Sequence, residues 1–430
     1  MDATGKHPER ERDENGNPRV SAEAAPEVGQ RNPFTNRDYR AWLTATVVTA
    51  LGVGVQIAVV PLFIGERVDP DDRAAAIAGA LIIQTLPGVF LTLLGGVVAD
   101  RIEPRLLLFR ATAVAATVAA VYVVLTAADV TIVWPVFALS AVVGAVAAFE
   151  QPARQGVLPQ MVTRPQLQNG VIIGNMGFLA AGQFGGPALG GLVGGFASLT
   201  TAFALQTGLL ALGAVLFLGI GRYEPRAIER RDVRADLGEG LRYVRGSRNI
   251  IGLLVLAAMP GVFYAGPLQV NMLLIVEDVL ELPPSWLGIL FGAFGAGMFV
   301  SSLLMTLRPL PKRGLLLALS PVLGGPVLAL FGLSEAAWLS VLLLIAIGPF
   351  AAIFMNLSLA LLQEQTEQVV MGRVMGVYSL MFVISSPIGF AQTALVSSLF
   401  GPQVSTVASA LAGSVIGILL LVWLPVRKLR

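Results

Sequence analysis

The stretch GQFGGPALGG (182–191) contains five glycines and one proline, and it lies inside an uncharged apolar segment that spans 169–196. Glycine and proline are the poorest helix formers in water. In a lipid bilayer they are more frequent in helices, because small residues let two helix backbones approach closely. The stretch therefore indicates a membrane-spanning helix that packs tightly against another helix.

The spacing of the glycines points to one face of that helix. Gly182, Gly186 and Gly190 recur every four residues, so together they leave a groove without side chains. Pro187 removes one backbone hydrogen bond and predicts a kink. We expect this groove to be a close contact at which the two halves of the molecule touch and pivot. The alternative is static tight packing with no moving part.

The chain as a whole is also strongly apolar. It has 430 residues, of which 55% are hydrophobic and 13% are charged, and its mean hydropathy is +0.76. A helix needs roughly 20 apolar residues to cross a bilayer, and no strand-like alternation is present. The sequence therefore predicts an all-α polytopic membrane protein. Twelve apolar blocks are the candidate spans: 41–64, 74–98, 106–127, 132–149, 169–196, 201–221, 249–276, 285–307, 314–333, 336–362, 369–398 and 403–425.

The basic residues are distributed unevenly among the connections. Lys and Arg gather in the N-terminal tail, in 222–248, in the C-terminal tail and in the loops after the second, fourth and eighth blocks. The alternate loops hold only Arg67 and Arg73 beside nine acids. By the positive-inside rule both termini face the cytoplasm, and we expect the protein in the inner, cytoplasmic membrane. The pI near 9.1 reflects this loop bias, so no nucleic-acid partner is expected.

Six blocks on each side of a basic connection suggest an internal duplication. In support of it, Pro187 lies 200 residues before Pro387. An amphipathic surface helix is expected in the connection, with a solvated linker as the alternative. The expected units are a disordered cytoplasmic tail (1–37), a six-helix half (38–221), a cytoplasmic linker (222–248), a second six-helix half (249–425) and a short cytoplasmic tail (426–430).

Residue types that carry most chemistry are rare. The chain has no cysteine, and its one histidine is His7 in the N-terminal tail. Only Arg110 and Arg373 are charged within the twelve blocks, and no acid lies in any of them. We therefore expect no enzyme activity, no cofactor and no metal site.

The sequence GGVVADRIEPR (95–105) joins the second and third blocks. A connection this short makes two helices neighbours and places its charges at the membrane surface; a plain turn with basic residues is the alternative. The stretch resembles the loop signature of the major facilitator superfamily, with Glu103 and Pro104 departing from it. The matching residues are Gly96, Asp100, Arg101 and Arg105.

Three other stretches resemble the drug, macrolide and enterobactin exporter branch of that superfamily: FEQPARQGVLPQMV (149–162), GLRYVR (240–245) and MGRVMGVYSLMF (371–382). The resemblance implies the major facilitator fold and a gate of loop charges. In this gate Asp100 would face the region of Arg373, and Arg105 would face Glu150, with Arg101 and Arg154 nearby. The glycine-rich stretch also resembles the fifth-helix signature of antiporters, at Gly182, Gly186, Pro187, Gly190 and Gly191.

The same resemblance implies that the first, fourth, seventh and tenth spans surround a central cavity. The polar residues then expected to line the cavity are Gln56, Tyr264, Gln269, Asn271 and Asn356. The alternative for each is a hydrogen bond to a neighbouring helix. Because none is charged, they favour an apolar or weakly polar substrate over an ion.

Together these features predict a secondary transporter that exports hydrophobic or amphipathic small molecules by alternating access. The expected partners of the monomer are a drug, macrolide or siderophore-like substrate, protons and the lipid bilayer. Two other readings stay open. One is an uncoupled or importing metabolite carrier, which the missing intramembrane acid favours. The other is a non-transporting membrane sensor or assembly component.

Overall fold

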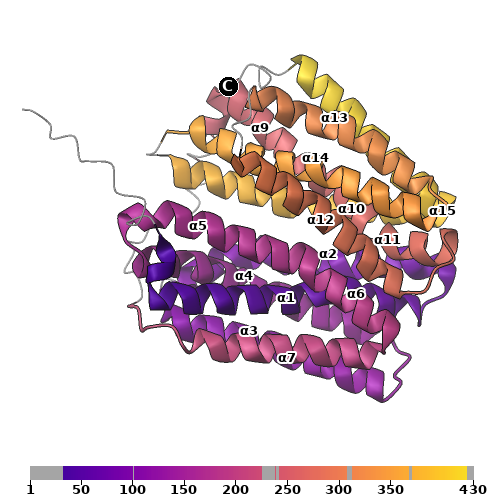
Figure 1. Ribbon diagram of the computed structural model, residues 1–430, viewed down its shortest axis with the longest axis horizontal. Coiled ribbons are helices and arrows are strands. Elements are labelled where there is room, and N and C mark those ends of the chain that lie inside the picture. Colours follow the sequence, from indigo (N-terminus) through magenta and orange to yellow (C-terminus); the bar gives the residue numbers. More distant parts are fainter. Residues whose placement is uncertain are drawn as a thin grey trace, which may run out of the picture.

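A computed structural model describes residues 32–99, 101–224, 238, 242–307, 312–367 and 370–423. This part of the chain is helical and contains no strand. Ten of its helices are long and apolar enough to cross a membrane. Figure 1 shows that the helices form two groups, with α1 to α7 below and α9 to α15 above. The predicted all-α membrane fold is therefore confirmed.

The first group has one helical rod for each of the first six predicted blocks, although α4 continues past the end of its block. It comprises α1 (Arg37–Gly65), α2 (Pro70–Ala99), α3 (Pro104–Ala127), α4 (Trp134–Met161), α5 (Arg164–Leu179), the π-helical turn η3 (Ala180–Gly185), α6 (Gly186–Phe196) and α7 (Leu199–Phe217). A short 3₁₀ turn, η2 (Pro33–Thr35), precedes it.

The second group contains more breaks. It comprises α9 (Arg248–Met259), the π turn η4 (Pro260–Tyr264), α10 (Ala265–Gln269), α11 (Asn271–Leu274), the π turn η5 (Ile275–Val279), α12 (Ser285–Leu307), α13 (Arg313–Gly332), α14 (Ala337–Glu364) and α15 (Met371–Trp423). The long helix α15 turns at Gly401, where φ is +85°, so it consists of two limbs. If α5–η3–α6 and α9–η5 are each taken as one rod, the described residues are consistent with twelve spans.

Most of the predicted linker lies outside the described residues, as do the tail residues 1–31 and 424–430. Arg242 and Arg245 are exposed on a short helical stretch, whereas Val244 is buried against the second group.

Polar caps set where several helices begin. Asn36 accepts from the backbone N–H of Asp38 at 2.8 Å and starts α1, and Ser198 accepts from Thr201 N–H at 3.1 Å and starts α7. Thr163 and Gln166 form a capping box at α5. These caps satisfy N–H groups that have no partner within their own helix.

The two ends of the bundle differ in charge. One end holds the start of α1, the end of α2 and the connecting residues 101–103, 218–224 and 242–247, and we call it the basic end. The other holds the connections 66–69, 128–133, 280–284 and 333–336, which carry five acids and a single base, Arg67, and we call it the acidic end.

Hydrophobic packing also differs between the ends. At the acidic end one core includes buried side chains from both groups, such as Phe63 and Phe203 from the first and Leu274 and Leu290 from the second. At the basic end each group has a core of its own. Tyr39, Trp42 and Phe217 belong to one of these cores, and Leu317, Leu361 and Val374 belong to the other. The two groups are therefore packed together at the acidic end and packed separately at the basic end.

The glycine groove does not lie between the two groups, contrary to the expectation from sequence. Gly182, Gly186 and Gly190 pack on α1 of the same group. A Cβ atom at Gly186 would lie 2.5 Å from the Cα of Gly54, which leaves room for no side chain at either position. The groove thus holds α6 against α1 inside the first group.

A second face of α6, also formed by glycines, contacts the second group of helices. A Cβ atom at Gly191 would lie 2.6 Å from the Cα of Gly288 in α12, and Gly195 lies against Ser285 of the same helix. Gly191 is one residue beyond the groove, so it points about 100° away from Gly190 around the helix. The short helix α6 therefore contacts α1 on one face and α12 on another.

The expected kink at Pro187 takes the form of the π turn η3. The N–H of Gly186 bonds to the carbonyl of Ala181, five residues earlier. Pro187, which follows, has no N–H to give to the carbonyl of Gln183. A π turn of this kind bends the rod and changes which residues face the neighbouring helices.

We predict that Gly186→Leu lowers the melting temperature of the purified protein. The new side chain would collide with the backbone of α1 at Gly54, and overpacking of this kind costs about 1–3 kcal/mol or more. The measurement is thermal unfolding in detergent.

The matched control is Gly208→Leu, because a Cβ at Gly208 meets nothing within 4 Å. Equal melting temperatures for the two variants would contradict the close approach of α6 to α1.

Candidate functional site

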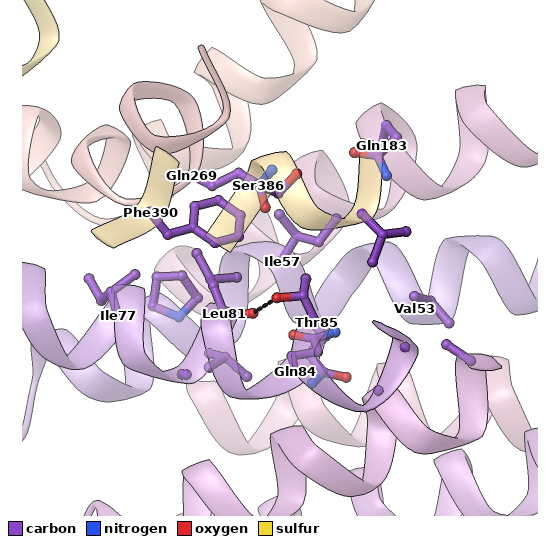
Figure 2. Close-up of a pocket in the computed structure, with 18 of the residues that line it drawn as sticks. Val53, Ile57, Ile77, Leu81, Gln84, Thr85, Gln183, Gln269, Ser386 and Phe390 are labelled. Atoms are coloured by element: carbon purple, nitrogen blue, oxygen red, sulfur yellow. Dashed lines mark hydrogen bonds between the residues drawn. The ribbon is translucent and has the colours of Figure 1, made fainter. Parts of the chain in front are cut away.

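A cavity of about 310 Å³ lies between the two groups of helices. Residues of α1, α2 and α4 line it from the first group, with Gln183 of η3; Gln269 of α10 and three residues of α15 line it from the second. Figure 2 shows Gln84 and Thr85 of α2 on one side and Gln269, Ser386 and Phe390 on the facing side. The cavity is thus formed jointly by both groups.

The polar surface of this cavity consists of uncharged groups. Among its described lining residues none is charged, and the polar ones are Gln56, Gln84, Thr85, Gln151, Gln183, Gln269 and Ser386. Glutamine amides both donate and accept hydrogen bonds. Such a lining can bind neutral polar groups of a ligand while the apolar residues cover its hydrocarbon surface.

Most of these glutamines are available to a ligand. Gln84, Gln151, Gln183 and Gln269 make no hydrogen bond with another described residue. Gln56 differs, because its Oε1 accepts from Gln206 Nε2 at 3.1 Å and its side chain is buried. Thr85 is also engaged, since its hydroxyl donates to the carbonyl of Leu81 at 3.0 Å.

Two of the five residues predicted for the cavity lie in its lining, namely Gln56 and Gln269. Asn271 is buried away from it, where its amide donates to the Pro402 carbonyl and the Thr406 hydroxyl and accepts from Ser397. Asn271 therefore ties α11 to the turn between the limbs of α15.

The remaining two residues also bond to neighbouring helices. Tyr264 Oη donates to the carbonyl of Pro321 at 3.1 Å, and Asn356 Nδ2 donates to Ser302 Oγ at 3.3 Å and to the carbonyl of Ala352 at 2.9 Å. These residues correspond to the alternative reading, in which a polar group in a span serves helix packing.

Sequence reasoning missed five of the seven polar lining residues, four of them because it assigned the cavity to only four spans. Gln84 and Thr85 come from the second span, Gln183 from the fifth and Ser386 from the eleventh. The available signal was the rarity of glutamine in apolar blocks. Gln151 lies just past the end of its block and had no such signal.

The structure places four of the predicted gate residues at the basic end, namely Gly96, Arg101, Arg105 and Arg373. Asp100 lies outside the described residues. Gly96 is in the last turns of α2, Arg101 is exposed in the turn after it, and Arg373 is in the first turn of α15. The expected pair of Arg105 with Glu150 is not formed, because Arg105 Nη1 donates to the carbonyl of Ile220 at 3.3 Å.

Glu150 and Arg154 lie in the interior of α4, which continues to Met161. Their side chains are 8% and 4% exposed, and Arg154 is the cation that acts electrostatically on Glu150. The guanidinium of Arg154 also stacks 3.6 Å above the ring of Phe178. The apolar block ends at residue 149, but α4 continues to Met161, so Glu150 is part of the same helix.

Comparison with known proteins places these features in one family. A family model described as transmembrane secretion effector, within the major facilitator superfamily, matches residues 28–429. Among curated proteins, the enterobactin exporter EntS of Shigella flexneri is 26% identical over 251 residues, which is 57% of this chain and 59% of the relative. The corresponding exporter of Escherichia coli O81 (strain ED1a) is 26% identical over 257 residues, which is 57% of this chain and 60% of the relative. The chain thus spans about three fifths of the length of these relatives.

Solved structures show the same fold at low sequence identity. A mutant of the peptide transporter POT in complex with sulfate superimposes with a TM-score of 0.71 at 15% identity, over 92% of this chain and 96% of the other. The human organic anion transporter MFSD10 superimposes with a TM-score of 0.66 at 14% identity, over 90% of this chain and 99% of the other. The nucleoside transporter NupG superimposes with a TM-score of 0.63 at 14% identity, over 89% of this chain and 98% of the other. The chain belongs to the transmembrane secretion effector family of major facilitator superfamily transporters.

Proposed function

We propose that this protein exports hydrophobic or amphipathic small molecules across the cytoplasmic membrane in exchange for protons. The observation that carries the proposal is the uncharged cavity between the two groups of helices, in which four of the five lining glutamines have no hydrogen-bond partner among the described residues. A neutral amide lining favours substrates with carbonyl, hydroxyl or amide groups on an apolar body. Siderophore-like and drug-like compounds have this character.

The distribution of charge supports an orientation. Lys and Arg gather at the basic end, so the positive-inside rule assigns that end to the cytoplasm and the acidic end to the outside. The two groups share a core only at the acidic end. The conformation then corresponds to a state closed to the outside, and alternating access would require a second state in which the acidic end separates.

Glu150 is our candidate for the proton-binding group of the exchange. It is a buried carboxylate inside a span, one residue from the cavity-lining Gln151 and within the electrostatic reach of Arg154. Ionisable residues in that position are costly and commonly belong to proton or substrate pathways.

We expect everted membrane vesicles that contain the protein to accumulate amphipathic compounds when the vesicle interior is acidic. The panel should include enterobactin, which the curated relatives are named for exporting. Collapse of the pH gradient should abolish the accumulation. Uptake that is indifferent to the gradient would indicate the uncoupled carrier. If no compound accumulates above vesicles without the protein, the transport proposal is wrong.

Glu150→Gln should remove the dependence of transport on the pH gradient while counterflow exchange of substrate persists. The neutral amide keeps the shape of the side chain but cannot bind and release a proton. Glu364→Gln is the control, because Glu364 is a half-exposed acid paired with Arg313 at 2.6 Å at the end of α14. Retention of full gradient dependence in Glu150→Gln would exclude Glu150 from coupling.

Gln84→Leu and Gln269→Leu should each raise KM for substrates with hydrogen-bonding groups by about threefold to tenfold, the loss expected for one hydrogen bond of about 0.5–1.5 kcal/mol. Substrates without such groups should be affected less. The exposed Gln363, which lies outside the lining, provides the control Gln363→Leu. An unchanged KM in both cavity variants would contradict the assignment of the cavity as the binding site.

A further inference from the structure

Ion pairs cross between the two groups of helices at the acidic end. Arg73, in the first turn of α2, places its Nη1 atom 3.2 Å from Glu277 Oε2 and 3.6 Å from Asp278 Oδ1. Both acids belong to η5 in the second group. The Arg73 and Glu277 side chains are only 19% and 22% exposed, whereas Asp278 is 41% exposed. This contact is therefore partly shielded from water.

Arg73 is held in place by its own group. Its Nε atom donates to the carbonyl of Val68 at 3.2 Å, which leaves Nη1 directed at the second group. The guanidinium thus moves with α2 and the carboxylates move with η5. Any motion that separates the acidic ends must break these ion pairs.

The surroundings of Glu277 contain more acids than bases. Glu66, at the end of α1, acts on Glu277 electrostatically, and Arg67 pairs with Glu66 at 2.9 Å and with Asp129 at 3.8 Å. Two guanidinium groups, Arg67 and Arg73, thus face four carboxylates, Glu66, Asp129, Glu277 and Asp278, which gives a formal charge of −2 when all are ionised.

The other elements packed on η5 do not offset this excess. The helix α11 is Asn-Met-Leu-Leu, and α15 contains no acid or base after Arg373 except the phenol of Tyr378. The backbone of Gly65 also lies near Glu277 and brings no charge. A cluster with this charge balance can accept a proton and still keep both of its arginines paired.

The seventh span includes these acids although its apolar block ends at residue 276. The helical rod continues through η5 to Val279. Arg67 and Arg73, the two exceptions to the charge bias of the loops, are the cations of this cluster. Their position is thus explained by the carboxylates that they contact.

We propose that Arg73, Glu277 and Asp278 form a pH-sensitive latch that holds the acidic ends of the two groups together and opens when Glu277 is protonated from outside. Glu277 is the closer and the more buried partner of Arg73. Its protonation replaces an ion pair by a weaker neutral contact and leaves Arg73 with Asp278 alone. An acidic external medium then shifts the protein toward a state open to the outside. The proposal rests on the orientation given under the proposed function.

The test uses cysteine labelling, because the natural chain contains no cysteine to react in the background. Thr85→Cys places a thiol in the cavity, behind the shared core at the acidic end. A membrane-impermeant maleimide applied outside intact cells labels it only when that end opens. Each rate is divided by the rate of Asp71→Cys at the same pH, since the thiolate fraction itself depends on pH. Asp71 is exposed.

Glu277→Gln should raise the normalised labelling rate at neutral pH by about threefold to tenfold, as expected for loss of a half-buried ion pair. The unaltered latch should show a rise of similar size between about pH 7 and about pH 4, as the pH falls into the range of about 3 to 5 in which glutamates in proteins titrate. Glu277→Gln should show no such rise. The exposed Asp72 gives the control Asp72→Asn, which should behave like the parent.

A charge swap separates a latch from a general loss of structure. Arg73→Glu combined with Glu277→Arg should return labelling toward the parent rate, whereas Arg73→Glu alone should increase it. The proposal is overturned if Glu277→Gln labels at the parent rate, if it keeps the pH response, or if the swap labels as fast as the single variant. If Glu277→Gln does not fold, the pH response of the parent decides.

Labelling requires neither substrate nor flux, so its result is independent of the transport assay. A labelling response without any flux would support the latch and contradict the carrier. Flux with no change in labelling would support the carrier and overturn the latch.

Discussion

Contact between helix backbones at glycine is the constraint on which this structure depends. Lipid tails are as apolar as leucine, so helices in a membrane associate through close packing rather than through a hydrophobic driving force. Gly54 and Gly186 meet where a Cβ atom would be 2.5–2.9 Å from the facing backbone or Pro187, and Gly191 meets Gly288 in the same way. The helix α6 takes part in both contacts. A shift of α12 would therefore act directly on α6, against which α1 is packed.

The breaks in the helices lie beside the residues that face the cavity. Gln183 is in the π turn η3, and Gln269 ends the short helix α10 that follows the π turn η4. A π turn rotates the following residues relative to a regular helix, so it changes which side chains face inward. The glycine and proline residues that would weaken a helix in water here allow two glutamines to reach the same cavity from different groups.

Charge is separated from the cavity along the molecule. The described lining is neutral, the acidic end carries the ion pairs that cross between the groups, and the basic end holds Arg101, Arg105 and Arg373. A charge in the apolar middle would require a partner or water. The buried Glu150 and Arg154 lie four residues apart in one helix and interact electrostatically, and the guanidinium of Arg154 also stacks on the ring of Phe178. The ends can therefore carry electrostatic contacts while the cavity remains suited to uncharged substrates.

The helical membrane fold, the apolar spans and the charge bias of the connections could all be predicted from the amino-acid sequence, because hydropathy and loop charge are local properties. The sequence also identified Gly186 as a site of close packing, but not that its neighbour is α1. Only the tertiary structure decided that Gln84 lines the cavity while Asn271 bonds to Thr406, since either amide could face a cavity or a helix. It alone paired Arg73 with Glu277, which lie 204 residues apart, because such a contact depends on how the two groups of helices pack.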